Sequence, residues 1–409
     1  MKTLFIGMLY RVENFEEINK ASKSGMEIAS DKYQKNFIEG LYNNDISCDV
    51  VSSISVGSYP LNYSKLFIKG SYFFDSSGTC YSEIGFINFY VFKGISRFLN
   101  MLIPLFKWLK SINKIEGGIV YVYSLYLPYL IIMLLFKIGM FRKNIKYCLI
   151  VPDLYGKYAI VPPIFSVKGV YHRIESFFLS ILIRCPDYFV LFTDQMKEAT
   201  KSYNSNSVVI EGLISDRQIK LYEANDVLSP ADKFIFLYTG SLLPQFGIST
   251  FIDALLSIGR SDVELWICGP HKESLYLREV LESNKIIKYL GFLNENEIVK
   301  VQKQATVLVN PRPNIGNYVR FSFPSKTMEY MLSGTPILMF ELDGLPNEYK
   351  DLMYFFDNYN VPSMSNIINF VCSLDRAELE NTGLKAKSFV VNQKNSGYQV
   401  KKLLKLIKV

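Results

Sequence analysis

Histidine is scarce in this sequence of 409 residues, which contains only His172 and His271, so a histidine-rich metal centre is not expected. The six cysteines are scattered without CxxC pairs or even spacing. This pattern is typical of reduced packing residues and argues against a zinc site or a disulfide framework. A DxD metal-binding motif is absent as well. The sequence therefore predicts neither a metal site nor a cofactor.

The sequence also lacks a signal peptide and a clear membrane span. Its first residues, MKTLFIGMLY, run straight into a strand-like segment without a small-residue cleavage site, which disfavours secretion. The longest uncharged run, residues 117–136, has the length of a membrane helix, but it alternates at first and is interrupted by Ser124 and Pro128. We interpret it as a buried strand followed by a helix, with a membrane-embedded segment as the alternative.

Acidic residues are nearly missing from residues 84–150, where nine basic residues accompany Glu116 alone. The stretch includes FLNMLIPLFKWLK, in which large apolar residues alternate with lysines. A basic amphipathic helix of this kind can lie on an anionic membrane surface, although a core helix with a solvated lysine face gives the same pattern. No nucleic-acid-binding motif accompanies the charge, so nucleic acid is not an expected partner.

The length favours two domains, and a hydrophobic content of 49% allows each a core of its own. Apolar runs alternate with helical patterns almost throughout, which is typical of βα units and parallel sheets. A polar, proline-containing stretch interrupts this pattern after residue 215. We predict a first domain at 1–218, a linker at 219–232, a second domain at 233–389, and a basic amphipathic helix at 390–409 that packs back on the first domain or touches a membrane.

The predicted elements define two open parallel sheets. In the first domain a helix is predicted at 26–42, residues 57–85 fit no element, and strands are predicted at 3–9, 48–55, 118–124, 146–153, 188–193 and 207–213. In the second domain helices at 248–258, 274–282, 295–304 and 325–332 alternate with strands at 234–239, 263–268, 286–292, 306–310 and 336–341. We therefore predict an α/β fold of two Rossmann-like domains with parallel sheets facing across a crevice, where ligands bind beyond the carboxyl ends of the strands.

The turn before the helix at 325–332 is unusually basic. It carries Arg312, Arg320 and Lys326 with no acid until Glu329. The N-terminus of a helix attracts phosphate through its free N–H groups and its dipole, and arginine suits bidentate phosphate contacts. The three cations are therefore candidates for binding a nucleotide diphosphate, against the alternative of ordinary surface charges.

Glu329 has no evident structural role in this helix. Ser325 is a plausible N-cap, but the position three residues further on is Met328, so Glu329 does not complete a capping box. Lys326 precedes Glu329, which is the unfavourable order for an ion pair along a helix. Glu329 is thus available to accept hydrogen bonds from a ligand, such as those of ribose hydroxyls, unless it is an ordinary solvated glutamate.

Several motifs stand out in the second half of the sequence: FPSKTMEYMLSGTPIL, YTGSLLPQFGISTFIDAL, LWICGPHKESL and KYLGFLNENEIVKVQKQATVLVNPR, with VVIEGLISD after DYFVLFTDQM in the first domain. Together they resemble the donor domain of retaining GT-B glycosyltransferases of family 4, of the type found in bacterial capsule, exopolysaccharide and O-antigen synthesis. The likeness covers about residues 185–350 and is weak before them.

The resemblance implies roles for particular residues. Glu329 matches the second glutamate of the family's E-x7-E motif, which binds the donor ribose, and Gly240 matches the glycine beside the donor diphosphate. Gly269 and Phe292 match positions that line the base pocket. We accordingly predict as donor-binding residues Gly240, Ser241, Gly269, Phe292, Arg312, Phe323, Ser325, Thr327 and Glu329, and as catalytic residues Asp153, Arg320, Lys326 and Glu329.

Three features depart from the family's pattern. The first glutamate of E-x7-E falls on Phe321, and the basic pair after the donor-loop glycine falls on Ser241 and Phe246. The first-domain histidine often placed by the donor sugar matches Pro152. Next to it, Asp153 is expected to orient a sugar hydroxyl or the acceptor, unless it is a strand-end structural residue. The three cations of the basic turn are the candidates to replace the missing basic pair.

The resemblance implies a retaining transfer in which the leaving diphosphate helps to deprotonate the acceptor, so the protein mainly positions the diphosphate and neutralises its charge. The expected donor is a UDP-sugar, and the expected acceptor is a polyprenyl diphosphate-linked saccharide in bacterial surface polysaccharide synthesis. This acceptor and the basic first domain predict a cytoplasmic protein, peripheral at the inner face of the cell membrane. The alternatives are a catalytically inactive glycosyltransferase-like partner protein and a UDP-sugar 2-epimerase with a similar two-sheet layout.

Overall fold

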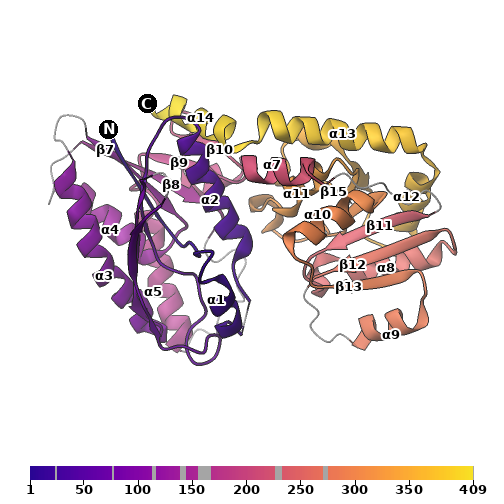
Figure 1. Ribbon diagram of the computed structural model, residues 1–409, viewed down its shortest axis with the longest axis horizontal. Coiled ribbons are helices and arrows are strands. Elements are labelled where there is room, and N and C mark those ends of the chain that lie inside the picture. The colour runs from indigo at the N-terminus through magenta and orange to yellow at the C-terminus, as the bar shows by residue number, and fades with distance from the viewer. Residues whose placement is uncertain are drawn as a thin grey trace. The chain divides into compact units, whose positions relative to one another are not determined.

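The chain folds into two compact units in a computed structural model that describes residues 1–23, 25–75, 78–112, 117–138, 144–154, 167–225, 233–269 and 275–408. Unit 1 comprises Met1–Leu213 together with Ser396–Val409, and unit 2 comprises Ile214–Asn395. In each unit helices pack on a central sheet (Figure 1). The predicted α/β fold with parallel sheets in two domains is confirmed.

Unit 1 contains an eight-stranded sheet and a separate antiparallel pair in the part of the chain that the structure describes. The strands are β1 (Lys2–Gly7), β2 (Asp49–Ser52), β3 (Phe67–Ile68), β4 (Ser71–Phe74), β5 (Cys80–Glu83), β6 (Phe86–Ile87), β7 (Gly118–Tyr123), β8 (Ile145–Val151), β9 (Tyr188–Leu191) and β10 (Ser207–Val209). The sheet order is β10-β9-β8-β7-β1-β2-β5-β4, and β4 pairs antiparallel with β5 at one edge. Every residue of β7 is buried, as expected of a parallel strand covered on both faces.

Helices cover both faces of this sheet. They are α1 (Phe15–Ala21), α2 (Ile28–Tyr42), α3 (Tyr90–Ser111), α4 (Leu127–Lys137), α5 (Val167–Leu182), α6 (Met196–Thr200) and α14 (Ser396–Ile407). On one face, α2 and α14 share a core in which Phe37 and Leu403 pack with Phe5 of β1. On the other face, α3 packs beside α4 and α4 beside α5 (Figure 1).

The uncharged run of the sequence forms the strand β7 and the helix α4, as predicted. Among the described residues, no helix is both long enough and apolar enough to cross a membrane. All six cysteines are free thiols, and Cys48, Cys148 and Cys268 are buried.

Unit 2 contains a six-stranded sheet within its described residues, and its neighbouring strands are all parallel. The strands are β11 (Phe234–Thr239), β12 (Val263–Cys268), β13 (Ile287–Gly291), β14 (Val307–Asn310), β15 (Ile337–Phe340) and β16 (Tyr354–Phe356). Their order is β13-β12-β11-β14-β15-β16. From β11, the next two strands, β12 and β13, extend the sheet on one side. The chain then returns to β14, which pairs with the other side of β11, and β15 and β16 extend the sheet on that side. The carboxyl edge between β11 and β14 is thus a topological switch point, where open α/β sheets bind their ligands.

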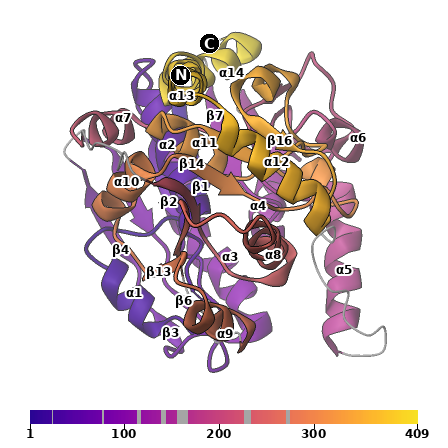
Figure 2. The ribbon, with the colours of Figure 1, turned by 90° about the vertical axis from the view of Figure 1, so that its right-hand side faces the viewer.

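Helices also pack on both faces of the unit 2 sheet. They are α7 (Asp216–Glu223), α8 (Ile248–Ser257), α9 (Leu275–Ser283), α10 (Glu295–Gln304), α11 (Lys326–Ser333), α12 (Val361–Ser373) and α13 (Arg376–Gln393), with short 3-10 helices η1 (Pro244–Phe246), η2 (Val319–Phe321) and η3 (Asn347–Leu352). Helix α12 packs against α8 (Figure 2), while α11 packs against α10 and α13.

The element and unit boundaries differ from the predicted ones at two places. The segment predicted as a linker at 219–232 overlaps α7, whose N-terminus is fixed by a capping box between Ser215 and Gln218, and residues 226–232 lie outside the described part. The helix predicted at 390–409 is two helices, α13 and α14, with the unit boundary between them. Helix α14 packs on α2, within unit 1.

Candidate functional site

Four of the predicted donor-binding residues follow the carboxyl ends of neighbouring strands in unit 2. Gly240 follows β11, Gly269 follows β12, Phe292 follows β13, and Arg312 comes two residues after β14. Parallel pairing places all four ends at the same edge of the sheet. Gly240 and Arg312 flank the switch point between β11 and β14.

The turns after β11 and β12 pack closely against each other because Gly240 and Gly269 have no side chains. Their φ angles are 144° and 143°, in a region that L residues rarely adopt. A Cβ atom on Gly269 would lie 2.0 Å from the carbonyl oxygen of Gly240. The Gly240 N–H donates to the Cys268 carbonyl at 2.7 Å, and the Gly269 N–H donates to the Gly291 carbonyl at 3.0 Å. The edge of the sheet therefore presents bare backbone at this point.

Lys326, the first residue of α11, brings its ammonium to this bare backbone. A Cβ atom on Gly240 would lie 1.3 Å from the Nζ of Lys326, and the same Nζ lies 5.1 Å from the centre of the Tyr238 ring. Among the described residues Lys326 has no hydrogen-bond or ion-pair partner. Burial lowers the pKa of Lys326 to about 8, and the charge of Glu329 opposes this shift. An unpaired, largely desolvated cation is costly unless an anion binds it.

The N-terminus of α11 offers less to a ligand than the sequence predicts. Ser325 takes the N-cap position and is exposed, but its side chain makes no capping hydrogen bond among the described residues. The hydroxyl of Thr327 is buried without a hydrogen-bond partner in the described part of the chain, and the Thr327 N–H donates to the Pro324 carbonyl at 2.9 Å. Thr327 therefore faces the interior, while Glu329 is half-buried one turn further on.

The two arginines of the basic turn lie against aromatic rings. Arg312 donates from Nη1 to Ser322 Oγ at 3.2 Å, and its guanidinium lies 5.3 Å from the centre of the Tyr318 ring. The guanidinium of Arg320 lies 5.0 Å from the centre of the Phe321 ring. Phe321 itself is only 6% exposed. The position of the family's first glutamate is therefore filled by an apolar core side chain.

The two phenylalanines predicted to contact the donor have opposite environments. Phe323 is 7% exposed and packs against Tyr349, with 5.5 Å between ring centres. Phe292 is 74% exposed at the end of β13. The ring of Phe292 is thus accessible to a nucleotide base, whereas Phe323 belongs to the core. Ser241, also predicted, is half-buried and accepts a hydrogen bond from the Tyr238 hydroxyl through its backbone carbonyl at 2.6 Å.

Tyr238, which none of the sequence motifs singles out, supports the candidate site in two ways. Its ring lies against the Lys326 ammonium, and its hydroxyl fixes the carbonyl of Ser241 in the turn after β11. The sequence does contain a signal for this role, because Tyr238 stands two residues before Gly240 in YTG. Alternate residues of a strand point to the same face, so Tyr238 is expected on the same face as position 240.

Asp153 lies in unit 1, whereas the other predicted catalytic residues belong to unit 2. It is exposed and follows the carboxyl end of β8 by two residues. Its charge adds to burial in raising the pKa of Tyr123, the last residue of the neighbouring β7. Asp153 is therefore at the carboxyl edge of the unit 1 sheet.

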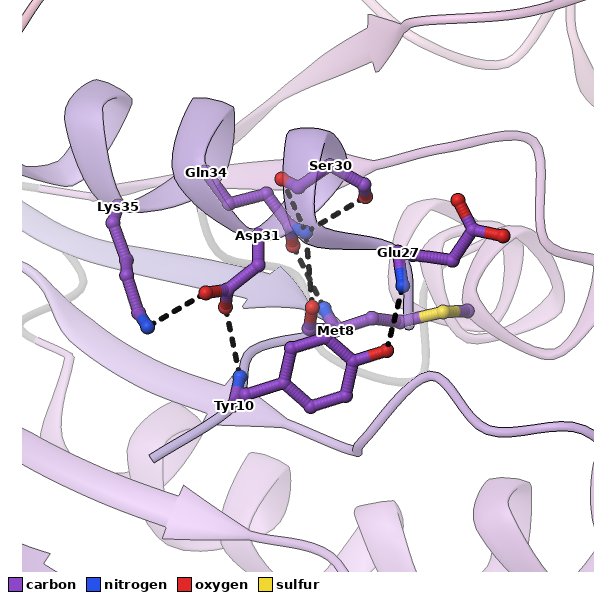
Figure 3. A network of polar contacts seen from close by, with 7 residues as sticks. All are labelled: Met8, Tyr10, Glu27, Ser30, Asp31, Gln34 and Lys35. Carbon is purple, nitrogen blue, oxygen red and sulfur yellow. Dashed lines mark hydrogen bonds and ion pairs between the residues drawn. The ribbon is translucent and has the colours of Figure 1, made fainter. Parts of the chain in front are cut away.

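A network of polar contacts fixes the loop after β1 at the same edge (Figure 3). The amide of Gln34 accepts from the Met8 N–H at 2.7 Å and donates to the Met8 carbonyl at 3.0 Å. Asp31 accepts from the Tyr10 N–H at 2.8 Å and pairs with Lys35 at 2.7 Å. The Tyr10 hydroxyl accepts from the Glu27 N–H and donates to the Ser55 carbonyl, in the loop after β2. Two loops of this edge are thus held together.

A metal site is not found in the part of the chain that the structure describes, where no three His, Cys, Asp or Glu side chains are grouped to hold an ion. His271 lies outside that part, and His172 lies on α5.

Comparison with known proteins gives one family match and many structural matches. Residues 222–405 match the family model described as "Glycosyl transferases group 1". No curated protein matches the sequence. Sucrose-phosphate synthase from Thermosynechococcus elongatus has a TM-score of 0.66 at 14% identity, covering 100% of this chain and 99% of that chain.

Two further structures show the same architecture. "Trehalose-6-phosphate from E. coli bound with UDP-2-fluoro glucose" has a TM-score of 0.64 at 10% identity, with 100% of this chain and 99% of that chain covered. A glycosyltransferase from Rickettsia africae ESF-5 has a TM-score of 0.63 at 14% identity, with coverage of 100% and 98%. The chain therefore has the GT-B fold of these structures, and its residues 222–405 are similar to group 1 glycosyl transferases.

Proposed function

We propose that this protein is a retaining glycosyltransferase, similar to family 4 enzymes, which transfers a sugar from a UDP-sugar to a lipid-linked saccharide in bacterial surface polysaccharide synthesis. The observation that carries the proposal is the Lys326 ammonium resting on Gly240 at the switch point of the unit 2 sheet. The group 1 glycosyltransferase domain at residues 222–405 supports it. So does the UDP-2-fluoro glucose bound by the E. coli neighbour.

In this proposal the donor diphosphate lies over the bare turns of Gly240 and Gly269. Lys326 neutralises the charge that develops on the diphosphate as the glycosidic bond breaks, which is an electrostatic contribution to catalysis. Glu329 accepts hydrogen bonds from the ribose hydroxyls, and the exposed ring of Phe292 contacts the base. Arg312 and Arg320 add positive charge from the basic turn. Asp153, at the carboxyl edge of unit 1, orients a sugar hydroxyl or the acceptor.

We propose a peripheral position at the inner face of the cell membrane because the outer face of α3 is apolar. Phe92, Ile95, Leu99, Ile103 and Phe106 are between 37% and 64% exposed. Their spacing of three or four residues places them along one face of the helix. The helix also carries Lys107 and Lys110 and no acidic residue. Apolar and cationic side chains together suit an anionic membrane surface.

The proposal is tested by incubating the full-length protein with UDP-, GDP- and other nucleotide sugars. Slow hydrolysis of one donor is the expected result, together with a thermal shift caused by the corresponding nucleotide diphosphate. The buried Phe321 at the family's first glutamate position favours a second candidate, a catalytically inactive partner protein. A protein that hydrolyses no donor and copurifies with a second transferase would support that candidate instead.

UDP binding should weaken as the pH rises from 7 to 9. The pKa of Lys326 is about 8 in the ligand-free protein, so its charge is present below this value and is lost above it, while the diphosphate stays ionised.

The stability of the ligand-free protein should instead increase as the pH rises. Because the pKa is below the ordinary lysine value of 10.5, the unfolded chain binds more protons between these two pH values, and this group makes the folded state more stable as the pH rises through that window.

The pH effect is measured by calorimetric titration with UDP at several pH values. The variant Lys326→Met is the control, because its UDP affinity should hardly change over the same range. Equal pH dependence in both proteins would assign the effect to another group.

A further inference from the structure

Two cations on the first turns of α3 have no charged partner in the described part of the chain. Lys93 and Arg97 lie one turn apart on the helix, which begins at Tyr90. Arg97 is only 3% exposed, and Lys93 is half-buried. Neither has an ion-pair partner among the described residues. Buried charges in proteins are normally paired, because desolvation of an isolated charge is costly.

The contacts of the two side chains are with neutral groups. Arg97 donates to the Ile54 carbonyl and, at 3.3 Å, to the Tyr126 hydroxyl. Its guanidinium lies 4.0 Å from the centre of the Phe86 ring. Its Nε is buried without a hydrogen-bond partner in the described part of the chain. Lys93 donates to the Val56 carbonyl.

The electrostatic surroundings of this pair are also unfavourable for cations. Like charges four residues apart on a helix repel each other, and the positive end of the helix dipole adds to the repulsion. The first turn of α3 has no acidic residue, and its N-cap Phe89 supplies no side-chain hydrogen bond. Burial, and then the charge of Arg97, lower the pKa of Lys93 to about 7. A bound anion would offset the repulsion between the two cations, the repulsion by the helix dipole and the cost of burying the charges.

The pair lies where the unit 1 sheet is expected to bind ligands. Ile54 and Val56 belong to the loop after the carboxyl end of β2, and Tyr126 follows the carboxyl end of β7. The same loop is tied to the end of β1 through the Tyr10 hydroxyl and the Ser55 carbonyl. Ligands of parallel α/β sheets bind at this edge. Phe89, the N-cap residue of α3, and Phe92, which directly precedes Lys93, are 46% and 59% exposed.

We propose that Lys93 and Arg97, with the N-terminus of α3, form a binding site for a phosphate group in unit 1. Under the proposed function, on which this step rests, the phosphate belongs to the diphosphate of the lipid-linked acceptor, and the exposed aromatic rings beside it contact the hydrocarbon chain. A free phosphate ion shares the same chemistry. The residues of this site belong to unit 1, whereas Lys326 belongs to unit 2.

A purely structural role for the pair is the competing explanation. Lys93 and Arg97 hold two carbonyls of the loop after β2, and this alone would stabilise the loop. A carbonyl, however, needs only a neutral donor. The variant Lys93→Gln keeps a donor for the Val56 carbonyl and removes the charge, so it separates the two explanations.

The experiment titrates the full-length protein, saturated with UDP so that the donor site is filled, with farnesyl phosphate and with inorganic phosphate. Binding is followed by ³¹P NMR. Lys93→Gln is compared with the wild type and with Lys107→Gln, which removes an exposed charge from the same helix. We expect Lys93→Gln to weaken phosphate binding by about tenfold or more, since a charged hydrogen-bond donor is lost. Lys107→Gln should have little effect, and UDP affinity should not change.

The outcomes separate the two proposals. Tighter binding of farnesyl phosphate than of inorganic phosphate assigns the site to a lipid carrier, and equal binding assigns it to free phosphate. If Lys93→Gln binds both ligands as the wild type does, or if the wild type binds neither, the phosphate site is refuted. If farnesyl phosphate binds through Lys93 while UDP does not bind at all, the donor site fails and the unit 1 site stands.

Discussion

Replacing Lys326 with methionine should weaken UDP binding by about ten- to a hundredfold, the range expected for the loss of one charge-assisted phosphate contact. Methionine keeps the length and apolar stem of lysine and removes only the charge. The ammonium of Lys326 has no partner among the described residues and is largely desolvated against Gly240 and Tyr238. The same substitution should therefore leave the ligand-free protein as stable as the wild type or more stable.

These opposite effects distinguish a ligand-binding cation from a structural one. Calorimetric titration with UDP and thermal unfolding without ligand measure them in one set of samples. Lys300→Met is the matched control, because Lys300 is an exposed lysine on α10 of the same unit. A Lys326→Met protein that is destabilised and still binds UDP normally would place the diphosphate elsewhere.

Replacing Gly269 with alanine should destabilise the protein by about 3 kcal/mol or more and abolish detectable UDP binding. The φ angle of 143° is strained for alanine, and the new Cβ would lie 2.0 Å from the backbone carbonyl oxygen of Gly240. A backbone atom cannot rotate away as a side chain can. The turns after β11 and β12 would have to separate, which displaces the surface on which the diphosphate is proposed to lie.

Gly259→Ala is the control for the effect of a positive φ alone. Gly259 has a φ of 65°, and no atom lies within 4 Å of a Cβ built on it. Its substitution should cost only about 1 kcal/mol and leave UDP binding intact. Urea unfolding and UDP titration compare the two variants. Equal stability losses at both glycines would show that the contact between the two turns is not tight.

The sequence predicts the central strands well because parallel strands buried on both faces are continuous apolar runs. β7 and β11 illustrate this, since every residue of each is buried. Residues 57–85 were not assigned, because they form short strands such as β4, whose four residues alternate between half-buried and exposed. Such edge strands depend on pairing with neighbours, which a local pattern does not show.

For the candidate site, the sequence indicates which residues gather at the sheet edge but not how their side chains are directed. Lys326 and Gly240 are 86 positions apart in the numbering of the chain, and their contact depends on the packing of α11 against the sheet. Thr327 and Phe323 were expected to face the donor, yet both side chains are buried. Lys93 and Arg97 are two of the nine basic residues in the stretch 84–150, and the sequence assigns neither of them a site. Their burial depends on the loop after β2, which gives no sequence signal.

The position of α14 has a consequence for how the chain folds during translation. Unit 2 is inserted into unit 1, because unit 1 is completed only by Ser396–Val409. Val400 and Leu403 of α14 fill the core beside Phe37 of α2. On the ribosome, this apolar face of α2 stays uncovered until residues 396–409 have been translated. Unit 1 is therefore completed only after the whole of unit 2 has been made, whereas domains usually fold in order from the N-terminus.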